Sequence, residues 1–103
     1  MTSTMDIAAW QECVRAFTSE CDWEQFHTPK NLTMALSVEA SELLEIFQWL
    51  SAEQSTLVMQ SPAASAVRDE VADVLLYLLR LADVLELDLD ACMEHKIAEN
   101  ERR

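Results

Sequence analysis

The stretch VEASELLEIFQW, residues 38–49, decides the fold of this chain. Its apolar residues recur at the spacing of an α-helix, and Leu43 and Ile46 lie on the same side of the helical wheel as Glu39. Glu39 therefore lies inside the apolar stripe of the predicted helix, and Glu42 lies at its edge. An unpaired carboxylate is costly to bury, so a carboxylate in such a position is neutral, paired or bound to a metal ion.

A second apolar segment, VRDEVADVLLYLLRLADVL at residues 67–85, carries the same feature. Val74 and Tyr77 lie on the same side of this predicted helix as Glu70, and Asp73 follows one turn on. Each helix thus has an acidic pair three residues apart, a spacing that makes the two side chains neighbours. If the helices pack face to face, four carboxylates surround one centre, and like charges stay ionised in a core only beside a cation. Oxygen ligands without cysteine or histidine favour Mg²⁺ or Mn²⁺.

Acidic pairs at this spacing also arise by chance in a chain with 19 acidic residues, and Asp83 with Glu86 is an example. The alternative interpretation of the pairs is a solvated acidic face that holds no ligand. The apolar surroundings of Glu39 and Glu70 are what favour a metal site over this alternative.

The composition favours a single all-helical domain over residues 1–103. There is no glycine, whereas Ala, Leu, Glu and Met are abundant, which suits helices and disfavours tight hairpins. The missing glycine excludes a Walker A loop and a dinucleotide-binding turn, because both need glycine where the backbone meets phosphate. The formal net charge of −12 argues against binding of DNA or RNA by a basic surface.

Four helices are expected, in a bundle-like arrangement. Thr28 followed by Pro29 is a helix start signal, and Ser51 and Gln54 have capping-box spacing in the connector after the second helix. Asp88 can cap the last helix. The expected helices span about residues 4–20, 29–50, 61–85 and 88–103.

The cysteines and the lengths of the apolar runs indicate the cellular location of the protein. Cys13, Cys21 and Cys92 have no C-x-x-C spacing, so we expect reduced thiols in a cytoplasmic protein. The N-terminal residues lack a signal-peptide pattern, and no uninterrupted apolar run reaches the ~18 residues of a membrane span. We therefore expect no membrane partner.

The third predicted helix carries apolar residues almost all round the helical wheel: Val71, Val74, Leu75, Leu76, Leu78, Leu79 and Leu81. A helix that is apolar on every side is buried on every side. In a four-helix monomer one helix cannot easily be central, so part of this surface should meet another chain. We expect a homodimer or homotetramer.

The acidic pairs and the segments around them resemble the MazG-like nucleoside triphosphate pyrophosphohydrolases. E-x-x-E at 39–42 and E-x-x-D at 70–73 look like the signature of that family. The resemblance covers nearly the whole chain from Trp23 to Arg103, and its motifs fall in the family's order. The motifs that look like the dCTP pyrophosphatase branch are DWEQFHTPKNL (22–32), E-x-x-E-L-x-E-x-F-Q-W (39–49), DE-x-x-DVL-x-YL (69–78) and HK-x-x-x-N-x-RR (95–103).

The resemblance implies an enzyme that cleaves a (deoxy)nucleoside triphosphate such as dCTP between its α- and β-phosphates, with Mg²⁺ or Mn²⁺. Glu39 or Glu42 is expected to accept the proton of the attacking water. Val14 stands where some members carry a histidine, which leaves the preferred nucleobase open. The implied catalytic residues and metal ligands are Glu39, Glu42, Glu70 and Asp73. The implied substrate contacts are Trp23, Glu24, Gln25, Phe26, His27, Lys30, Asn31, Trp49, Tyr77, Lys96 and Asn100.

Two other interpretations have a weaker basis. Glu24 and His27 form the E-x-x-H of di-iron bundles, but that site needs the motif twice, and His95 has no acid at that spacing. The chain could also be a non-catalytic acidic helical module that dimerises or docks a partner. Thermal stabilisation by a divalent metal separates the two, because a docking module has no reason to show it.

Overall fold

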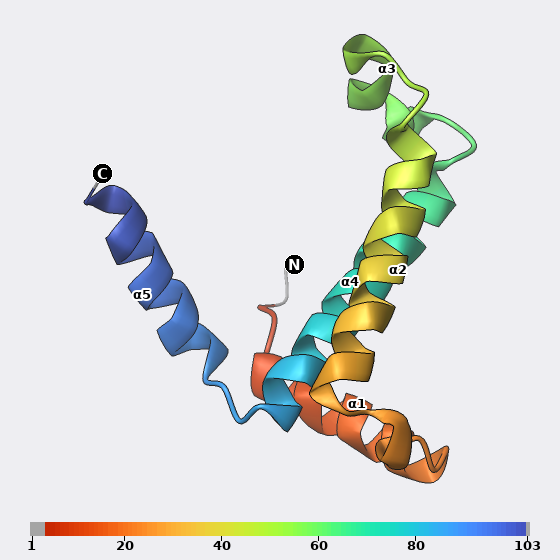
Figure 1. Ribbon diagram of the computed structural model, residues 1–103. Helices are drawn as coiled ribbons and strands as arrows, with labels where there is room; N and C mark the ends of the chain where they lie inside the picture. Colours follow the sequence, from red (N-terminus) through yellow and green to blue (C-terminus); the bar gives the residue numbers. More distant parts are fainter. Residues whose placement is uncertain (1–3, 103) are drawn as a thin grey trace.

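The computed structural model describes residues 4–102, and helices connected by short loops make up this whole part of the chain (Figure 1). The all-α prediction is therefore confirmed; Arg103, which closes the last predicted motif, lies outside the described residues. The long helices are α1 (Ile7–Glu20), α2 (Pro29–Phe47), α4 (Ala64–Val84) and α5 (Leu89–Glu101). Three short ones connect them: η1 (Glu24–Phe26), α3 (Ala52–Thr56) and η2 (Val58–Gln60).

The helix starts follow the capping signals of the sequence. Thr28 caps α2 with Pro29 in its first turn, Ser51 and Gln54 form a reciprocal capping box at α3, and Asp88 caps α5, as predicted. The boundaries differ by a few residues from the expected ones. Asp6 caps α1, so this helix begins at Ile7 and not at Thr4. The other two differences are that α2 ends at Phe47 before Leu50 and that a turn at 61–63 precedes α4.

Two helices end in a left-handed residue although the chain has no glycine. Asp22 (φ 57°) follows α1, and Glu86 (φ 56°) follows α4. After α1, the Trp23 N–H donates to the Thr18 carbonyl at 3.0 Å, which is the long bond of a Schellman motif. The same bond after α4 joins the Leu87 N–H to the Ala82 carbonyl at 2.8 Å. These motifs turn the chain sharply, and the first of them places Trp23.

The core lies where α2, α4 and α1 meet. Helices α2 and α4 pack side by side along most of their length, and α1 packs across the C-terminal end of α4 (Figure 1). Within residues 4–102 the buried apolar side chains are Leu32, Val58, Leu79 and Ala82. The bundle-like packing thus holds for three long helices, whereas α5 stands apart from them in the single chain (Figure 1).

The open arrangement leaves the chain with an unusually large surface. Its radius of gyration is 16.1 Å, against about 13 Å for a compact domain of this length. Its accessible surface is 7966 Å², against about 5,900 Å² for a compact monomer of this mass. No helix within residues 4–102 combines the length and the apolar character that crossing a membrane requires.

Candidate functional site

The packing of α2 on α4 brings three carboxylates together. Glu39 on α2 and Glu70 and Asp73 on α4 each offer one oxygen, and these oxygens lie within 4.8 Å of one another. One oxygen of Glu39 and one of Glu70, Oε2 in both cases, are buried and have no hydrogen-bond partner. Glu42, one turn along α2 from Glu39, is exposed to solvent and is not one of these three.

This crowding makes the charged form of the central carboxyls unfavourable. Burial, followed by the neighbouring Glu70 carboxyl and the charges of Glu42 and Asp73, raises the pKa of Glu39 from 4.5 to about 7. Burial also raises the pKa of Glu70, and the charges of Glu42 and Asp73 act in the same direction. The metal-free site therefore holds the Glu39 carboxyl partly protonated near neutral pH.

The donor set fits a hard divalent cation. Buried carboxylate oxygens without partners are costly, and a cation coordinated by them removes both the desolvation cost and the mutual repulsion. The three residues supply oxygen atoms alone, which Mg²⁺ and Mn²⁺ prefer. Glu39, Glu70 and Asp73 could hold such an ion, and Glu42 lies beside them.

A cavity of about 350 Å³ opens between α1, α4 and the loop before α2, and it reaches the carboxylate cluster. Its α1 wall is mostly apolar and aromatic, whereas Glu39 and Asp73 line the side nearest the cluster. A flat aromatic group and an anionic group attached to it can therefore bind here together. The lining residues are Trp10, Cys13, Val14, Phe17, Thr18, Trp23, His27, Glu39, Asp73, Leu76, Tyr77 and Arg80.

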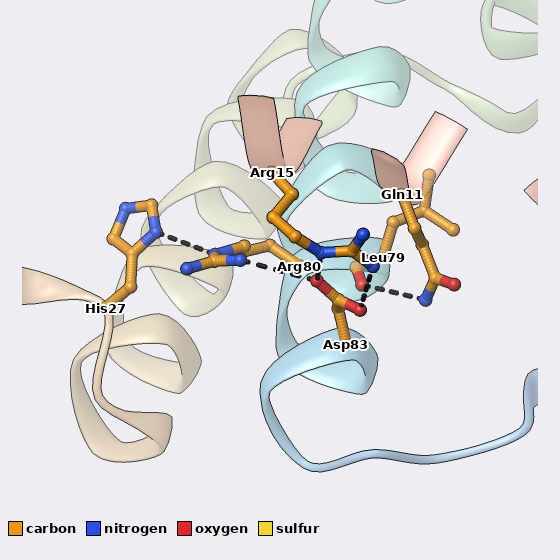
Figure 2. A network of polar contacts seen from close by, with 6 residues as sticks. All are labelled: Gln11, Arg15, His27, Leu79, Arg80 and Asp83. Atoms are coloured by element: carbon orange, nitrogen blue, oxygen red, sulfur yellow. Dashed lines mark hydrogen bonds and ion pairs between the residues drawn. The ribbon is translucent and has the colours of Figure 1, made fainter. Parts of the chain in front are cut away.

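The segment between α1 and α2 carries two of these lining residues. Trp23 follows the Schellman turn, and its ring meets Phe17 edge to face at a centroid distance of 5.5 Å. Thr18 is fully buried beneath this turn. His27 lies just before the Thr28 cap of α2, where it contacts Arg80 of α4 (Figure 2). The loop is thus held to α1 at one end and to α4 at the other.

The predicted site residues divide into two groups. Trp23, His27, Tyr77, Glu39 and Asp73 line the cavity, and Glu70 lies in the adjoining cluster. The remaining ones lie outside the cavity of their own chain: Glu24, Gln25 and Phe26 in η1, Lys30 and Asn31 in the first turn of α2, Trp49 beyond the end of α2, and Lys96 and Asn100 on α5.

Trp49 differs most from expectation. On the predicted helix over about residues 29–50, Trp49 falls on the Glu42 side of the helical wheel, so the sequence predicts that it points toward the metal centre. Helix α2 ends at Phe47, and the Trp49 side chain is 87 % exposed. A helical wheel predicts side-chain directions only within the helix. Trp49 lies beyond the end of α2, and it does not line the cavity of its own chain.

Arg80 is the lining residue that the sequence reasoning overlooked. It is the one basic residue between Val71 and Val84, a segment that is otherwise apolar or acidic. Like Glu39, Arg80 is a charged residue within an apolar helix, and its burial requires a compensating partner. Trp10, Cys13 and Thr18 gave no such signal, because residues of these types are common on the inner side of a helix.

A family model, curated relatives and a solved structure are all similar to this chain. The model of the MazG-like family matches residues 34–103. Proteins called dCTP pyrophosphatase 1 from Rattus norvegicus and Homo sapiens are 43% and 42% identical over 88 residues, which is 84% of this chain and 52% of theirs. This chain therefore spans about half the length of these curated relatives. The crystal structure of a pyrophosphatase from Archaeoglobus fulgidus superposes with a TM-score of 0.88 at 37% identity, covering 99% of this chain and 94% of that one.

Proposed function

The chain belongs to the MazG-like family, and we propose that it is a metal-dependent nucleoside triphosphate pyrophosphohydrolase. It cleaves a (deoxy)nucleoside triphosphate between the α- and β-phosphates and releases a nucleoside monophosphate and pyrophosphate. The similarity to dCTP pyrophosphatases makes dCTP and related deoxynucleotides the proposed substrates.

One observation carries this proposal: Glu39 and Glu70 each bury a carboxylate oxygen without any hydrogen-bond partner, beside a cavity with an aromatic wall. An acidic docking module would expose its carboxylates to water, since nothing would repay their burial. A buried acidic cluster instead needs a cation, and a cation next to an aromatic cavity suits a ligand with both phosphates and a base.

The residues of the cluster have separate proposed roles. Glu39, Glu70 and Asp73 would hold Mg²⁺, with Mn²⁺ as the alternative. When bound, the ion supplies positive charge for the triphosphate, which a protein of net charge −12 would otherwise repel. Glu42 accepts the proton of the attacking water, because it is exposed and lies outside the three-carboxylate cluster.

The cavity receives the nucleoside. Trp23 offers an aromatic face to the base, and Tyr77 lines the same cavity. A volume of about 350 Å³ lies within the range of small-ligand sites.

Neighbouring chains complete the site in this proposal. Lys96 and Asn100 lie on α5, which stands apart from the rest of its chain, and Trp49 is almost fully exposed (Figure 1). In this arrangement the three side chains do not line the cavity of their own chain. We propose that a homodimer or homotetramer brings Lys96 and Asn100 to the phosphates and Trp49 to the base.

The test is a panel of nucleoside triphosphates with Mg²⁺, whose products are separated by anion exchange. The proposal expects a monophosphate and pyrophosphate in equal amounts, and it is wrong if the products are a diphosphate and orthophosphate. Glu70→Gln is the inactive control, and Glu53→Gln on the short helix α3, far from the cluster, is the matched active one (Figure 1).

A further inference from the structure

Arg80 is a buried, charged side chain in a part of α4 that offers it few polar neighbours. Its residue exposure is only 9 %, and it lines the cavity next to Leu76 and Tyr77. A guanidinium is always charged, so its burial must be compensated by partners. The polar contacts that the structure gives it identify those partners (Figure 2).

Arg80 lies between the imidazole of His27 and the carboxylate of Asp83. Its Nε–H donates to His27 Nδ1 at 3.0 Å, and its Nη1 lies 3.4 Å from Asp83 Oδ2. Asp83 in turn accepts two hydrogen bonds from Arg15 of α1, at 2.7 and 2.9 Å (Figure 2). The carboxylate thus fixes one edge of the Arg80 guanidinium, and the opposite edge faces the imidazole.

The contact dictates the protonation of His27. A guanidinium can only donate hydrogen bonds, so His27 Nδ1 must be the deprotonated, accepting nitrogen. The ring proton is then on Nε2, which makes this atom a hydrogen-bond donor. Burial and the charge of Arg80 both lower the pKa of His27, which agrees with a neutral ring.

We propose that Arg80 is a positioning residue that holds His27 as a neutral Nε2–H donor, and that this donor recognises a hydrogen-bond acceptor on the nucleobase. His27 and Arg80 both line the cavity, and His27 follows Trp23, the aromatic residue that would face the base, by four positions. A carbonyl oxygen or an unprotonated ring nitrogen of a pyrimidine has the required chemistry. This inference rests on the proposed function.

The first experiment measures the tautomer without any substrate. Long-range ¹H–¹⁵N correlation spectra of the ¹⁵N-labelled full chain distinguish the Nε2–H ring from the Nδ1–H ring and from a mixture. His95, exposed on α5, serves as the internal reference, and His95→Gln assigns the signals. We expect a single Nε2–H tautomer at His27 in the wild type and an exchanging mixture in Arg80→Met.

The second experiment measures turnover of dCTP with Mg²⁺. Arg80→Met should raise KM by about tenfold, which is the loss of one directed hydrogen bond, with kcat within about threefold. Arg15→Met is the matched control: it removes a guanidinium from the same Asp83 but touches neither His27 nor the cavity, so its KM should stay within about twofold.

A double-mutant cycle tests whether Arg80 acts through His27. If it does, Arg80→Met combined with His27→Gln raises KM no further than the larger single effect. A mixed tautomer at His27 in the wild type, a wild-type KM in Arg80→Met, or additive effects of the two substitutions would each overturn the inference. An enzyme that turns over no nucleoside triphosphate contradicts the proposed function instead, and the spectra then still decide the state of His27.

Discussion

Glu39 owes its raised pKa to residues of another helix as well as its own. Burial between α2 and α4, the Glu70 carboxyl, and the charges of Glu42 and Asp73 raise that pKa from 4.5 to about 7. Between these pH values the folded protein binds more protons at Glu39 than the unfolded chain does. The stability linked to Glu39 is therefore fully present below pH 4.5 and is lost as the pH rises through about 7.

This linkage predicts the pH dependence of the metal-free protein. Between pH 4.5 and 7, Glu39→Gln should lose less free energy of unfolding than the wild type does, because glutamine has no proton to release. Urea unfolding in a chelator at a series of pH values measures this difference. His27, whose pKa is lowered, contributes a slope of opposite sign, but it is present in both proteins. Equal slopes in the wild type and Glu39→Gln would contradict the assignment.

The second prediction concerns the role of Asp73 in binding the metal ion. Asp73→Asn should abolish turnover and the Mg²⁺-dependent rise in melting temperature, while the metal-free variant melts at the wild-type temperature or above. The reason is that the substitution removes both a ligand and one of the charges that repel Glu39. Thermal unfolding with and without Mg²⁺ measures this, with the exposed Asp69→Asn on the same helix as the control. Wild-type turnover in Asp73→Asn would show that Asp73 is not needed.

At the scale of elements, the helices were predictable because their signals are local. Thr28, Ser51 and Asp88 each bond to a backbone N–H three residues on, so a short stretch of sequence contains the whole interaction. The pairing of Glu39 with Glu70 was also predictable, since each of these carboxylates lies among apolar residues of its own helix. The bond between His27 and Arg80 spans 53 positions and depends on where α1 turns the chain, which no local pattern encodes.

The contact between α1 and α4 supplies a prediction about stability. Asp83→Asn should cost about 1–3 kcal/mol, because it leaves the buried Arg80 guanidinium without its carboxylate. Arg15→Met should cost less than Asp83→Asn, because the Arg15 side chain is half exposed and Arg80 keeps Asp83. Arg15 also lowers the pKa of Asp83, so this stabilisation is lost as the pH falls below 3.8. Denaturant unfolding measures both variants, and equal costs would refute the role of Arg80.

At the scale of the whole molecule, the surface of the single chain exceeds that of a compact monomer by about 2,000 Å². An obligate interface buries about 1,000–2,500 Å² on each partner. The excess surface of this chain therefore equals the area that one such interface would bury. Exposed apolar side chains lie on α1, α2, α4 and α5, so they are not confined to the helix that stands apart. They include Val71 and Leu78 on α4 and Met93 and Ile97 on α5. We expect a second copy of the chain to supply the matching apolar surface.

We therefore predict a homo-oligomer held together in part by α5. Met93 and Ile97, one turn apart on the same face of this helix, are both at least half exposed in the single chain. Met93→Glu combined with Ile97→Glu should shift the mass toward a monomer and abolish turnover, since Lys96 and Asn100 would no longer reach a neighbouring site. His95→Glu, on the opposite face of α5, is the matched control and should keep the wild-type mass. Sedimentation equilibrium at micromolar concentration, with and without Mg²⁺, measures the mass. A stable and active wild-type monomer would mean that α5 folds back to cover the apolar faces of its own chain, and the predicted assembly would be wrong.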